Sequence, residues 1–342
     1  MIQLQSQEGL FSNFREGAGW QNFQDKHHEA RTLLRQACDQ FRPEAIFLFF
    51  SGGYDSLVAT QVAYQTVLNH TVGLFSGPHS QPTIKVIHVN TGIGIEETRH
   101  YVRNMALWEG WDYAEYTTPI KYEDIVGKHG FPGPDAHRYM YIQLKERAID
   151  SLVRDSLVQR SSWRTFLTTV LQQSSALPLQ FQHYLYAALM EMYPVFRQAS
   201  KSKVLFVTGV RRQESTRRMG HVKAVQEEGR RIWVAPLLNW TKEDILNHIE
   251  FWQLPRNPVV DTLHMSGECL CGSYAHRGEM DEIMFWYPET GQRIRELERI
   301  VHGEGFPWGW EEAPPCWWKQ MKKGQEILPG FSTLCSSCEA HH

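Results

Sequence analysis

The apolar residues of the first third of the chain switch between two spacings. Leu33, Leu34 and Ala37 recur at helical spacing and predict a helix over about 26–41. The run 44–50 is almost entirely apolar, as in a strand buried on both faces of a parallel sheet. The elements predicted after it are a helix at 56–68, a strand at 83–89, a helix at 96–108 and a strand at 111–117. This alternation predicts an α/β fold with an open, mostly parallel twisted sheet and helices on both faces.

The pattern changes in the middle of the chain. Apolar residues recur at helical spacing through 138–198 without any strand signal, which predicts a helical insertion. Strand character returns at 204–208 and 231–234. Thr241 and Asp244 then open a helix in the manner of a capping box.

The last part of the chain has a different texture. Beyond Pro255, proline, glycine, tryptophan and cysteine are prominent, and one clear helix is predicted near 290–301. We expect this region to depend for its order on something other than a large core. The predicted domains are a helical lead-in at 1–42, an α/β domain at 43–265 that holds the insertion, and a cysteine-rich region at 266–342.

Composition and charge limit the class of protein. The 342 residues are 42% hydrophobic and 21% charged, which is ordinary for a globular chain. There is no apolar stretch of about 18 residues and no signal-peptide pattern, so we expect a cytoplasmic protein without a membrane partner. The net charge of -3 argues against a broadly basic surface for nucleic acids, but it leaves room for a local cationic cleft.

A glycine-containing loop follows the first predicted strand. It reads Ser51-Gly52-Gly53-Tyr54-Asp55-Ser56 and leads into a helix, which brings backbone N–H groups to the positive end of that helix. The glycines allow close approach of phosphate, and Ser51 and Ser56 add hydroxyl donors. Asp55 would brace the turn or help to position Mg²⁺. No lysine follows, so the loop is not of the GxxxxGK[ST] type, and the alternative is a plain tight turn.

A second loop, 209–218, follows another predicted strand and is rich in arginine. Residues 211–231 hold seven Lys or Arg against three Glu, so the local charge is positive. Guanidinium groups bind phosphate oxygens in pairs, and the candidates are Arg211, Arg212, Arg217 and Arg218. The alternative is a solvated charged turn.

Four of the six cysteines form two close pairs, Cys269-Leu270-Cys271 and Cys335-Ser336-Ser337-Cys338. Four thiolates are the ligand set of structural zinc or of an iron–sulfur cluster. Spacing does not choose between the two, although the short first pair slightly favours a cluster. The alternative is unliganded thiols. Cys38 and Cys316 are expected to be plain buried residues.

Four motifs in chain order resemble the PP-loop ATP pyrophosphatase superfamily, whose signature SGGxDS stands at 51–56. Within it, they resemble the phosphoadenosine-phosphosulfate (PAPS) reductase family. The other three are His88-Val89-Asn90-Thr91-Gly92 with Glu96-Glu97-Thr98, the loop Gly209–Arg218, and Pro236–Ile245. Asn90 replaces the family's usual Asp. The resemblance implies an adenine nucleotide alpha hydrolase-like fold.

The resemblance also implies roles for individual residues. The catalytic residues would be Ser51, Asp55, Ser56, Arg211 and Arg217. The nucleotide would be bound by all six residues of loop 51–56 and by His88, Asn90, Thr91, Gly92, Gly209, Arg211, Arg212, Ser215 and Arg218. Cys269, Cys271, Cys335 and Cys338 would hold a 4Fe-4S cluster or, less favoured, zinc.

Two departures narrow the resemblance. Met140 and Tyr141 stand where iron–sulfur sulfonucleotide reductases carry a cysteine pair, and the C-terminal Glu-Cys-Gly-Leu-His motif of those enzymes is absent. A cysteine pair at Cys269 and Cys271 instead resembles DNA phosphorothioation enzymes of the DndC/SspD type. That likeness implies ATP and Mg²⁺ as cofactors, a cysteine desulfurase as sulfur donor, and DNA and other defence proteins as partners.

The resulting hypothesis is an ATP pyrophosphatase that forms AMP and pyrophosphate and adenylylates a substrate for sulfur insertion, here into the DNA backbone. Two alternatives stay open: a sulfonucleotide reductase, which would need a redox-active thiol outside the four ligands, and a non-catalytic nucleotide-binding module of a defence complex.

Overall fold

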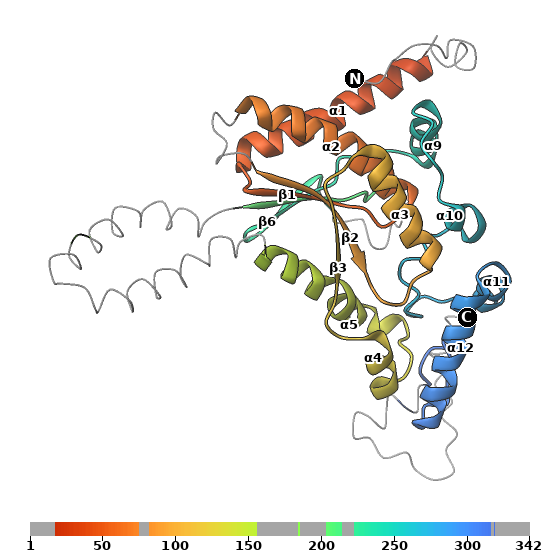
Figure 1. Cartoon of the computed structure of the whole chain (residues 1–342). Helices are drawn as coiled ribbons and strands as arrows, with labels where there is room; N and C mark the ends of the chain where they lie inside the picture. The colour runs from red at the N-terminus through yellow and green to blue at the C-terminus, as the bar shows by residue number, and fades with distance from the viewer. Residues whose placement is uncertain are drawn as a thin grey trace. The chain divides into compact units, whose positions relative to one another are not determined.

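The computed structural model describes residues 18–74, 82–155, 184, 203–213, 222–315 and 318, and Figure 1 shows its elements. The chain divides into two compact units, each built from segments that are separate in the sequence. Unit 1 comprises Met1–Val89, Tyr101–Tyr116 and Asp150–Asn257, and unit 2 comprises Asn90–His100, Thr117–Ile149 and Pro258–His342. The domain bounds expected from the sequence stay predictions.

A six-stranded sheet forms the centre of unit 1. Its strands are β1 (Ala45–Phe49), β2 (Thr83–Asn90), β3 (Tyr113–Thr117), β4 (Val204–Val207), β5 (Val225–Glu228) and β6 (Arg231–Val234). The order is β3-β2-β1-β4-β6-β5. β1 runs parallel to β2 and β4, β4 runs parallel to β6, and β5 pairs in the antiparallel sense with its neighbour β6. The predicted mostly parallel α/β fold is confirmed.

Long helices pack with this sheet. They are α1 (Ala18–Phe41), α2 (Tyr54–Leu74), α3 (Glu96–Glu109) and α9 (Lys242–Phe251). Figure 1 shows α1 and α2 side by side, and their apolar faces share one core with β1 and β4. The predicted capping box of α9 is confirmed, because Thr241 and Asp244 exchange hydrogen bonds there. β5 was not predicted, since Val225-Gln226-Glu227-Glu228 is an edge strand without a buried face.

Two histidines lie buried among α1, α2 and α9. The rings of His27 and His248 stack at 4.9 Å between centroids, with 3.1 Å between His27 Nε2 and His248 Nδ1. His248 Nε2 lies 2.9 Å from Gln61 Oε1 on α2. Burial, together with the nearby Arg31, lowers the pKa of His27 to about 4, and burial also holds the pKa of His248 well below its usual value. The folded protein therefore keeps both rings neutral.

We expect the free energy of unfolding to fall as the pH drops from about 6.5 towards about 4. The unfolded chain has the ordinary histidine pKa and binds protons first, so acid favours unfolding. His27 alone would account for a loss of about 3 kcal/mol. Urea denaturation at several pH values measures this loss. His27→Phe should flatten the pH dependence, whereas the matched change His302→Gln at an exposed position should not; equal slopes in all three proteins would contradict the expectation.

Unit 2 contains mostly short helices. They are α4 (Tyr122–His129), η1 (Pro134–Ala136), α5 (His137–Tyr141), the π-helical turn η2 (Ile142–Glu146), α10 (Pro258–Leu263), α11 (Glu279–Trp286) and α12 (Pro288–Gly303). The expectation that the C-terminal region lacks a large core is wrong for its described part. Ile283, Ile294 and Val301 are fully buried with Trp308 and Trp310.

This core could not be predicted from the sequence pattern because part of it comes from irregular backbone. Trp308 and Trp310 lie outside any helix, so they add to no helical periodicity, although both side chains are about 1% exposed. Trp308 Nε1 donates to the carbonyl oxygen of Phe131 at 2.9 Å, and Trp310 Nε1 donates to that of Leu270 at 2.8 Å. Both indole N–H groups are thereby satisfied in the core.

The predicted insertion at 138–198 falls largely outside the described residues. The part that is described, 138–155, is helical throughout. Within the described ranges, no helix has both the length and the hydrophobicity that are needed to cross a bilayer.

Candidate nucleotide site and cysteine pair

The predicted glycine loop joins β1 to α2 in unit 1. Gly52 has φ of 84°, a conformation that glycine adopts without strain. The backbone N–H of Ser51 donates to Ser56 Oγ at 3.2 Å, and the Ser56 hydroxyl donates to the carbonyl oxygen of Gly53 at 2.8 Å. Ser56 therefore closes the loop onto the first turn of α2. The candidate phosphate-binding features are the N-terminus of this 21-residue helix and the exposed Ser51 hydroxyl, whose oxygen lies 3.2 Å from Ser56 Oγ.

Asp55 and Arg211 form an ion pair next to this loop. Arg211 Nη2 donates to Asp55 Oδ2 at 2.8 Å, and its Nε makes an ionic contact with Oδ1 at 2.8 Å. The Arg211 side chain is 8% exposed and that of Asp55 is 22% exposed. The Asp55 carboxylate is thus engaged by Arg211. Of the two roles predicted for Asp55, bracing the turn and positioning Mg²⁺, this contact favours the first. Arg211 links the arginine loop to the glycine loop.

Gly209 lies where the end of β4 meets the start of α2. A Cβ atom built on Gly209 would lie 2.6 Å from the Asp55 carbonyl group and from the backbone nitrogen of Ser56. No side chain fits at that distance, because the neighbouring atoms are backbone. Gly209, expected from the sequence to contact the nucleotide, here permits the two loops to approach each other.

Two further residues of this site, Asn257 and Arg256, were not predicted from the sequence. Asn257, which is fully buried, donates from Nδ2 to the carbonyl oxygen of Gly52 at 2.9 Å. Arg256 stacks on Tyr54, with its guanidinium carbon 5.1 Å from the ring centroid, and its Nε donates to the Tyr54 hydroxyl at 3.1 Å. Tyr101 Oη donates to the carbonyl oxygen of Pro255 at 2.9 Å and fixes this segment.

Asn257→Ala should weaken nucleotide binding and lower the free energy of unfolding by about 1–3 kcal/mol, because the buried Gly52 carbonyl would lose its partner. Urea denaturation and the KM for ATP measure the two effects. Asn69→Ala on the exposed face of α2 is the matched control and should change neither. An unaltered KM in a destabilised Asn257→Ala protein would show that Asn257 supports the fold and not the loop.

The other predicted residues of unit 1 are placed as follows. His88 is fully buried, and its Nδ1 lies 2.8 Å from the carbonyl oxygen of Phe50, just before the glycine loop. Arg212 is exposed, and its backbone N–H donates to the carbonyl oxygen of Leu238 at 2.8 Å. Ser215, Arg217 and Arg218 lie outside the described residues.

The motif after β2 belongs to unit 2. Asn90 Oδ1 accepts from the N–H of Gly92 at 2.9 Å and shapes the turn. The Thr91 hydroxyl donates to the Glu268 carbonyl oxygen at 2.6 Å, and the Thr91 N–H donates to Glu268 Oε1 at 3.0 Å. Thr91 is buried and its hydroxyl serves the fold, and Arg99 Nε lies 3.7 Å from Glu268 Oε2. Glu268 thus connects this motif to the cysteine pair.

Cys269 and Cys271 are in contact within unit 2. A hydrogen bond from the Cys269 thiol, aided by the Ser273 hydroxyl at 3.3 Å, lowers the pKa of Cys271 to about 6. Lys145 on the π-helical turn faces them: burial works against its charge, but Cys269, Cys271 and Glu268 together raise the pKa of Lys145.

Two adjacent sulfurs fit one half of the predicted four-thiolate ligand set. Among the described residues, no group of three or more His, Cys, Asp or Glu side chains forms a metal site, and Cys335 and Cys338 lie outside them. Cys38 is fully buried, and burial raises its pKa to about 12, in line with the expected plain buried residue.

Residues 166–270 match the protein family described as "Phosphoadenosine phosphosulfate reductase domain". The match covers less than half of the chain and includes the arginine loop, α9 and Cys269. A comparison with curated proteins gives no match.

Several solved structures are similar to this chain. PAPS reductase from Candida auris has 15% identity and a TM-score of 0.37, over 72% of this chain and 93% of that one. FMN adenylyltransferase from Candida glabrata has 12% identity and a TM-score of 0.41, over 74% and 68%. NMN synthetase from Francisella tularensis has 14% identity and a TM-score of 0.34, over 79% and 95%. The fold assignment rests on the sheet itself, and the family match over 166–270 supports the PP-loop superfamily.

Proposed function

We propose that this chain is an ATP pyrophosphatase that adenylylates an acceptor and thereby prepares it for sulfur insertion, with the DNA backbone as the acceptor. The observation that supports the ATP chemistry best is the cradle of unit 1. There, Asp55 pairs with Arg211, and Asn257 holds Gly52, so that the loop is fixed at the N-terminus of α2. The family match over 166–270 supports a nucleotide substrate.

In this proposal the β- and γ-phosphates of ATP bind the backbone N–H groups at the start of α2, with the Ser51 hydroxyl as a further donor. Arg212 is exposed beside the braced loop, and its guanidinium group would bind the phosphates. Arg217 and Arg218, which lie outside the described residues, are proposed as further phosphate ligands. Mg²⁺ bound to the nucleotide would neutralise part of the phosphate charge. An acceptor oxygen attacks the α-phosphorus, the bond to the β-phosphate oxygen breaks, and pyrophosphate leaves.

The second half of the proposed reaction concerns sulfur. Excess cysteine thiol reduces the persulfide of a cysteine desulfurase and releases hydrosulfide. The hydrosulfide attacks the activated acceptor phosphorus, and AMP leaves with the bridging oxygen. Cys269 and Cys271, with Cys335 and Cys338, would hold an iron–sulfur cluster or zinc, and a cluster would supply sulfur- or electron-transfer chemistry. Lys145 beside the pair offsets the negative charge of thiolate ligands.

The test is product identification. ATP labelled in both the α- and the γ-phosphate is incubated with the full chain, a cysteine desulfurase, cysteine and DNA, and the labelled products are separated by chromatography. We expect AMP and pyrophosphate in equal amounts, and phosphorothioate linkages after digestion of the DNA. Asp55→Asn should release no pyrophosphate while keeping a native circular dichroism spectrum. Formation of ADP and phosphate, or undiminished release by Asp55→Asn, would contradict the assignment.

The metal has a separate expected result. Protein purified without oxygen should be brown with broad visible absorption, and Cys269→Ser should remove the colour, because a four-thiolate cluster tolerates the loss of one ligand poorly. The matched change Cys38→Ser, at a thiol outside the ligand set, should leave the colour. A colourless protein that contains one zinc per chain would exclude the cluster.

The family match also favours a second candidate, a sulfonucleotide reductase. Such an enzyme needs a reactive thiol outside the four ligands. Cys38 is unsuited to this role, because it is fully buried and its pKa is raised to about 12. Release of sulfite from PAPS or its 3′-dephosphorylated form would establish the reductase, and its absence alongside pyrophosphate release would exclude it.

A further inference from the structure

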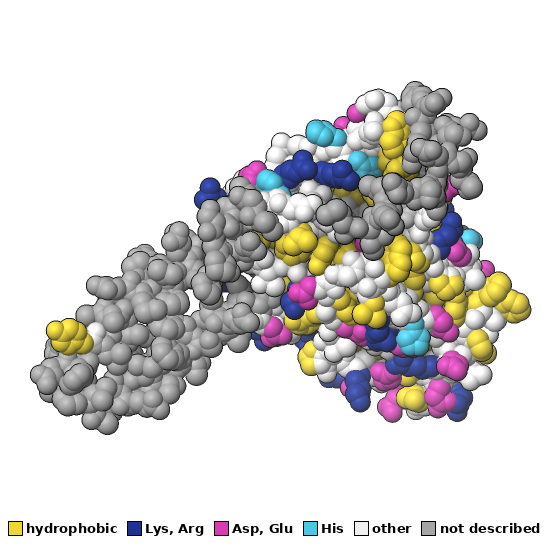
Figure 2. Space-filling view, turned by 45° about the horizontal axis from the view of Figure 1, so that its top comes forward, with side chains coloured by type: hydrophobic (Ala, Val, Ile, Leu, Met, Phe, Trp, Pro, Cys, Tyr) yellow, Lys and Arg dark blue, Asp and Glu magenta, His cyan; other side chains and the backbone are white. Residues whose placement is uncertain are grey.

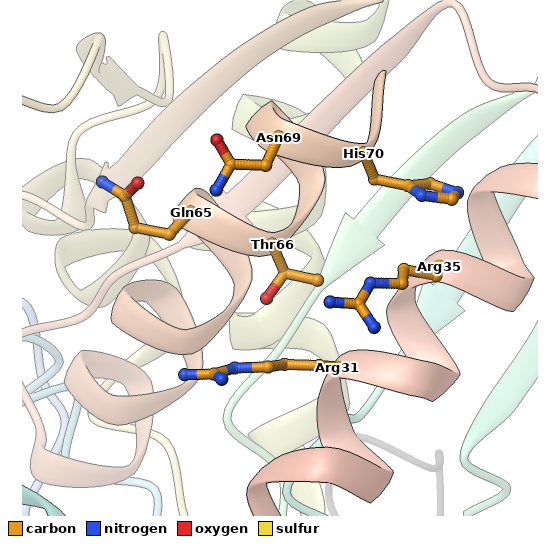
Figure 3. A pocket seen from close by; sticks show the side chains of 6 residues that line it. All are labelled: Arg31, Arg35, Gln65, Thr66, Asn69 and His70. Atoms are coloured by element: carbon orange, nitrogen blue, oxygen red, sulfur yellow. The ribbon is translucent and has the colours of Figure 1, made fainter. Parts of the chain in front are cut away.

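Three cavities on the outer face of unit 1 meet at Arg31. The first, of about 380 Å³, lies between α1 and α2 and is lined by Arg31, Arg35, Gln65, Thr66, Asn69 and His70. Figure 3 shows Arg31 and Arg35 reaching from α1 toward the side chains of α2. The second, of about 480 Å³, includes Trp20, and the third, of about 370 Å³, includes Trp108 and Trp252. Arg31 lines all three cavities, which together are called the Arg31 groove.

Most of the polar groups in the first cavity have nothing to bind within the protein. Among the described residues, the side chains of Arg31, Arg35, Gln65 and Asn69 make no ion pair and no hydrogen bond, and no carboxylate lines this cavity. Each of the four side chains is exposed. Two guanidinium groups on successive turns of a helix, beside two amides, suit an anionic ligand that also offers hydrogen-bonding edges.

Aromatic side chains flank these arginines. Trp108 is 59% exposed and Trp252 is 40% exposed, and together with Arg31 they line the third cavity. Large exposed tryptophans are uncommon on a surface without a partner, and their faces suit stacking with bases. Figure 2, which brings the upper side of Figure 1 forward, shows Lys and Arg side chains in a run with histidines beside them.

We propose that this groove binds single-stranded nucleic acid, with phosphates at Arg31 and Arg35 and bases stacked on Trp108 and Trp252. The choice of DNA as the strand rests on the proposed function. The inference that the groove binds a single strand rests on its arginines and tryptophans alone. The nine residues from Gln61 to Asn69 on α2 span about 12 Å of helix, which accommodates a few nucleotides. Two carboxylates, Asp25 and Glu109, border the outer cavities and oppose phosphate there.

The test uses the full chain and a fluorescein-labelled 20-nucleotide single-stranded DNA, measured by fluorescence anisotropy without ATP. The double variant Arg31→Gln/Arg35→Gln should bind at least tenfold more weakly. The negative slope of log association constant against log salt concentration should become shallower by about 1.4. Trp108→Ala should weaken binding about tenfold with the salt slope unchanged. Glu109→Gln should strengthen binding.

Arg299→Gln, which removes one positive charge at an exposed position of α12 in unit 2, is the control and should bind like the wild type. Equal affinity of the Arg31→Gln/Arg35→Gln protein and the wild type would overturn the proposal. A competition experiment could also overturn it. If inorganic pyrophosphate displaces the labelled DNA fully and excess unlabelled strand displaces none, the groove binds small phosphates.

The outcome is separable from that of the proposed function. Pyrophosphate release by Arg31→Gln/Arg35→Gln without DNA should equal that of the wild type, because both arginines lie outside the glycine loop and its contacts. If the double variant releases pyrophosphate normally and binds DNA as the wild type does, the groove proposal is wrong and the ATP chemistry stands. If DNA binding depends on the two arginines but the wild type splits no ATP, the groove proposal stands and the ATP chemistry is wrong.

Discussion

Gly209→Ala should lower pyrophosphate release from ATP by about a hundredfold, the largest catalytic loss expected from adding a single methyl group to this chain. The added Cβ would meet the Asp55 carbonyl and the Ser56 nitrogen at 2.6 Å, and neither is a flexible side-chain end. The arginine loop and the glycine loop must then separate by close to 1 Å. Steady-state kinetics of pyrophosphate release measures the loss.

Gly127→Ala is the matched control, because a Cβ at that position of α4 meets nothing within 4 Å. It should keep full activity. If Gly209→Ala unfolds, its thermal transition will reveal it, and Gly209→Ser, with a similar clash, should fail in the same way. Full activity in a folded Gly209→Ala protein would show that the distance between the two loops does not matter for the reaction.

Separating Asp55 from Arg211 should have the largest effect on stability. Arg211→Gln leaves a carboxylate without its counterion, and Asp55→Asn leaves a largely buried guanidinium, so each change should cost about 3 kcal/mol. The double variant should cost less than the sum, since it removes both charges together. Urea denaturation gives the three values, and pyrophosphate release should be absent in all three proteins.

The exposed pair of Arg293 and Glu123 supplies the comparison. Both side chains are more than one-third exposed, so Arg293→Gln should change the free energy of unfolding by less than about 1 kcal/mol. Strictly additive costs for Asp55 and Arg211 would mean that the two side chains stabilise the site independently, in contradiction to the geometry of their contact.

Local patterns predicted the secondary structure of unit 1 well. The buried strands are apolar runs, and the capping box of α9 is a four-residue signal, so both depend only on neighbours in sequence. The glycine loop is predictable for the same reason. The core of unit 2 was not, because Trp308 and Trp310 enter it from irregular backbone.

The parts of the site that could not be predicted from the sequence depend on contacts between residues far apart in the chain. Asp55 and Arg211 were both predicted as site residues, but their ion pair was not. The two residues are 156 positions apart, and local sequence patterns do not reveal contacts at that separation. Asn257 is 205 residues from Gly52, and nothing in Pro255-Arg256-Asn257 indicates a buried amide. Residues 214–221 and 319–342, which hold the remaining predicted ligands, lie outside the described residues, so their roles stay predictions.

The division of the sequence between the two units has a consequence for synthesis on the ribosome. In unit 2, the carbonyl oxygen of Ile93 accepts from the N–H of Leu270, and Trp310 closes the same core. The apolar side chains near Ile93 therefore emerge more than 170 residues before their partners. Pairings of such long sequence separation form slowly. We therefore expect unit 2 to complete its core only late in translation, and expression at low temperature should raise the yield of folded protein.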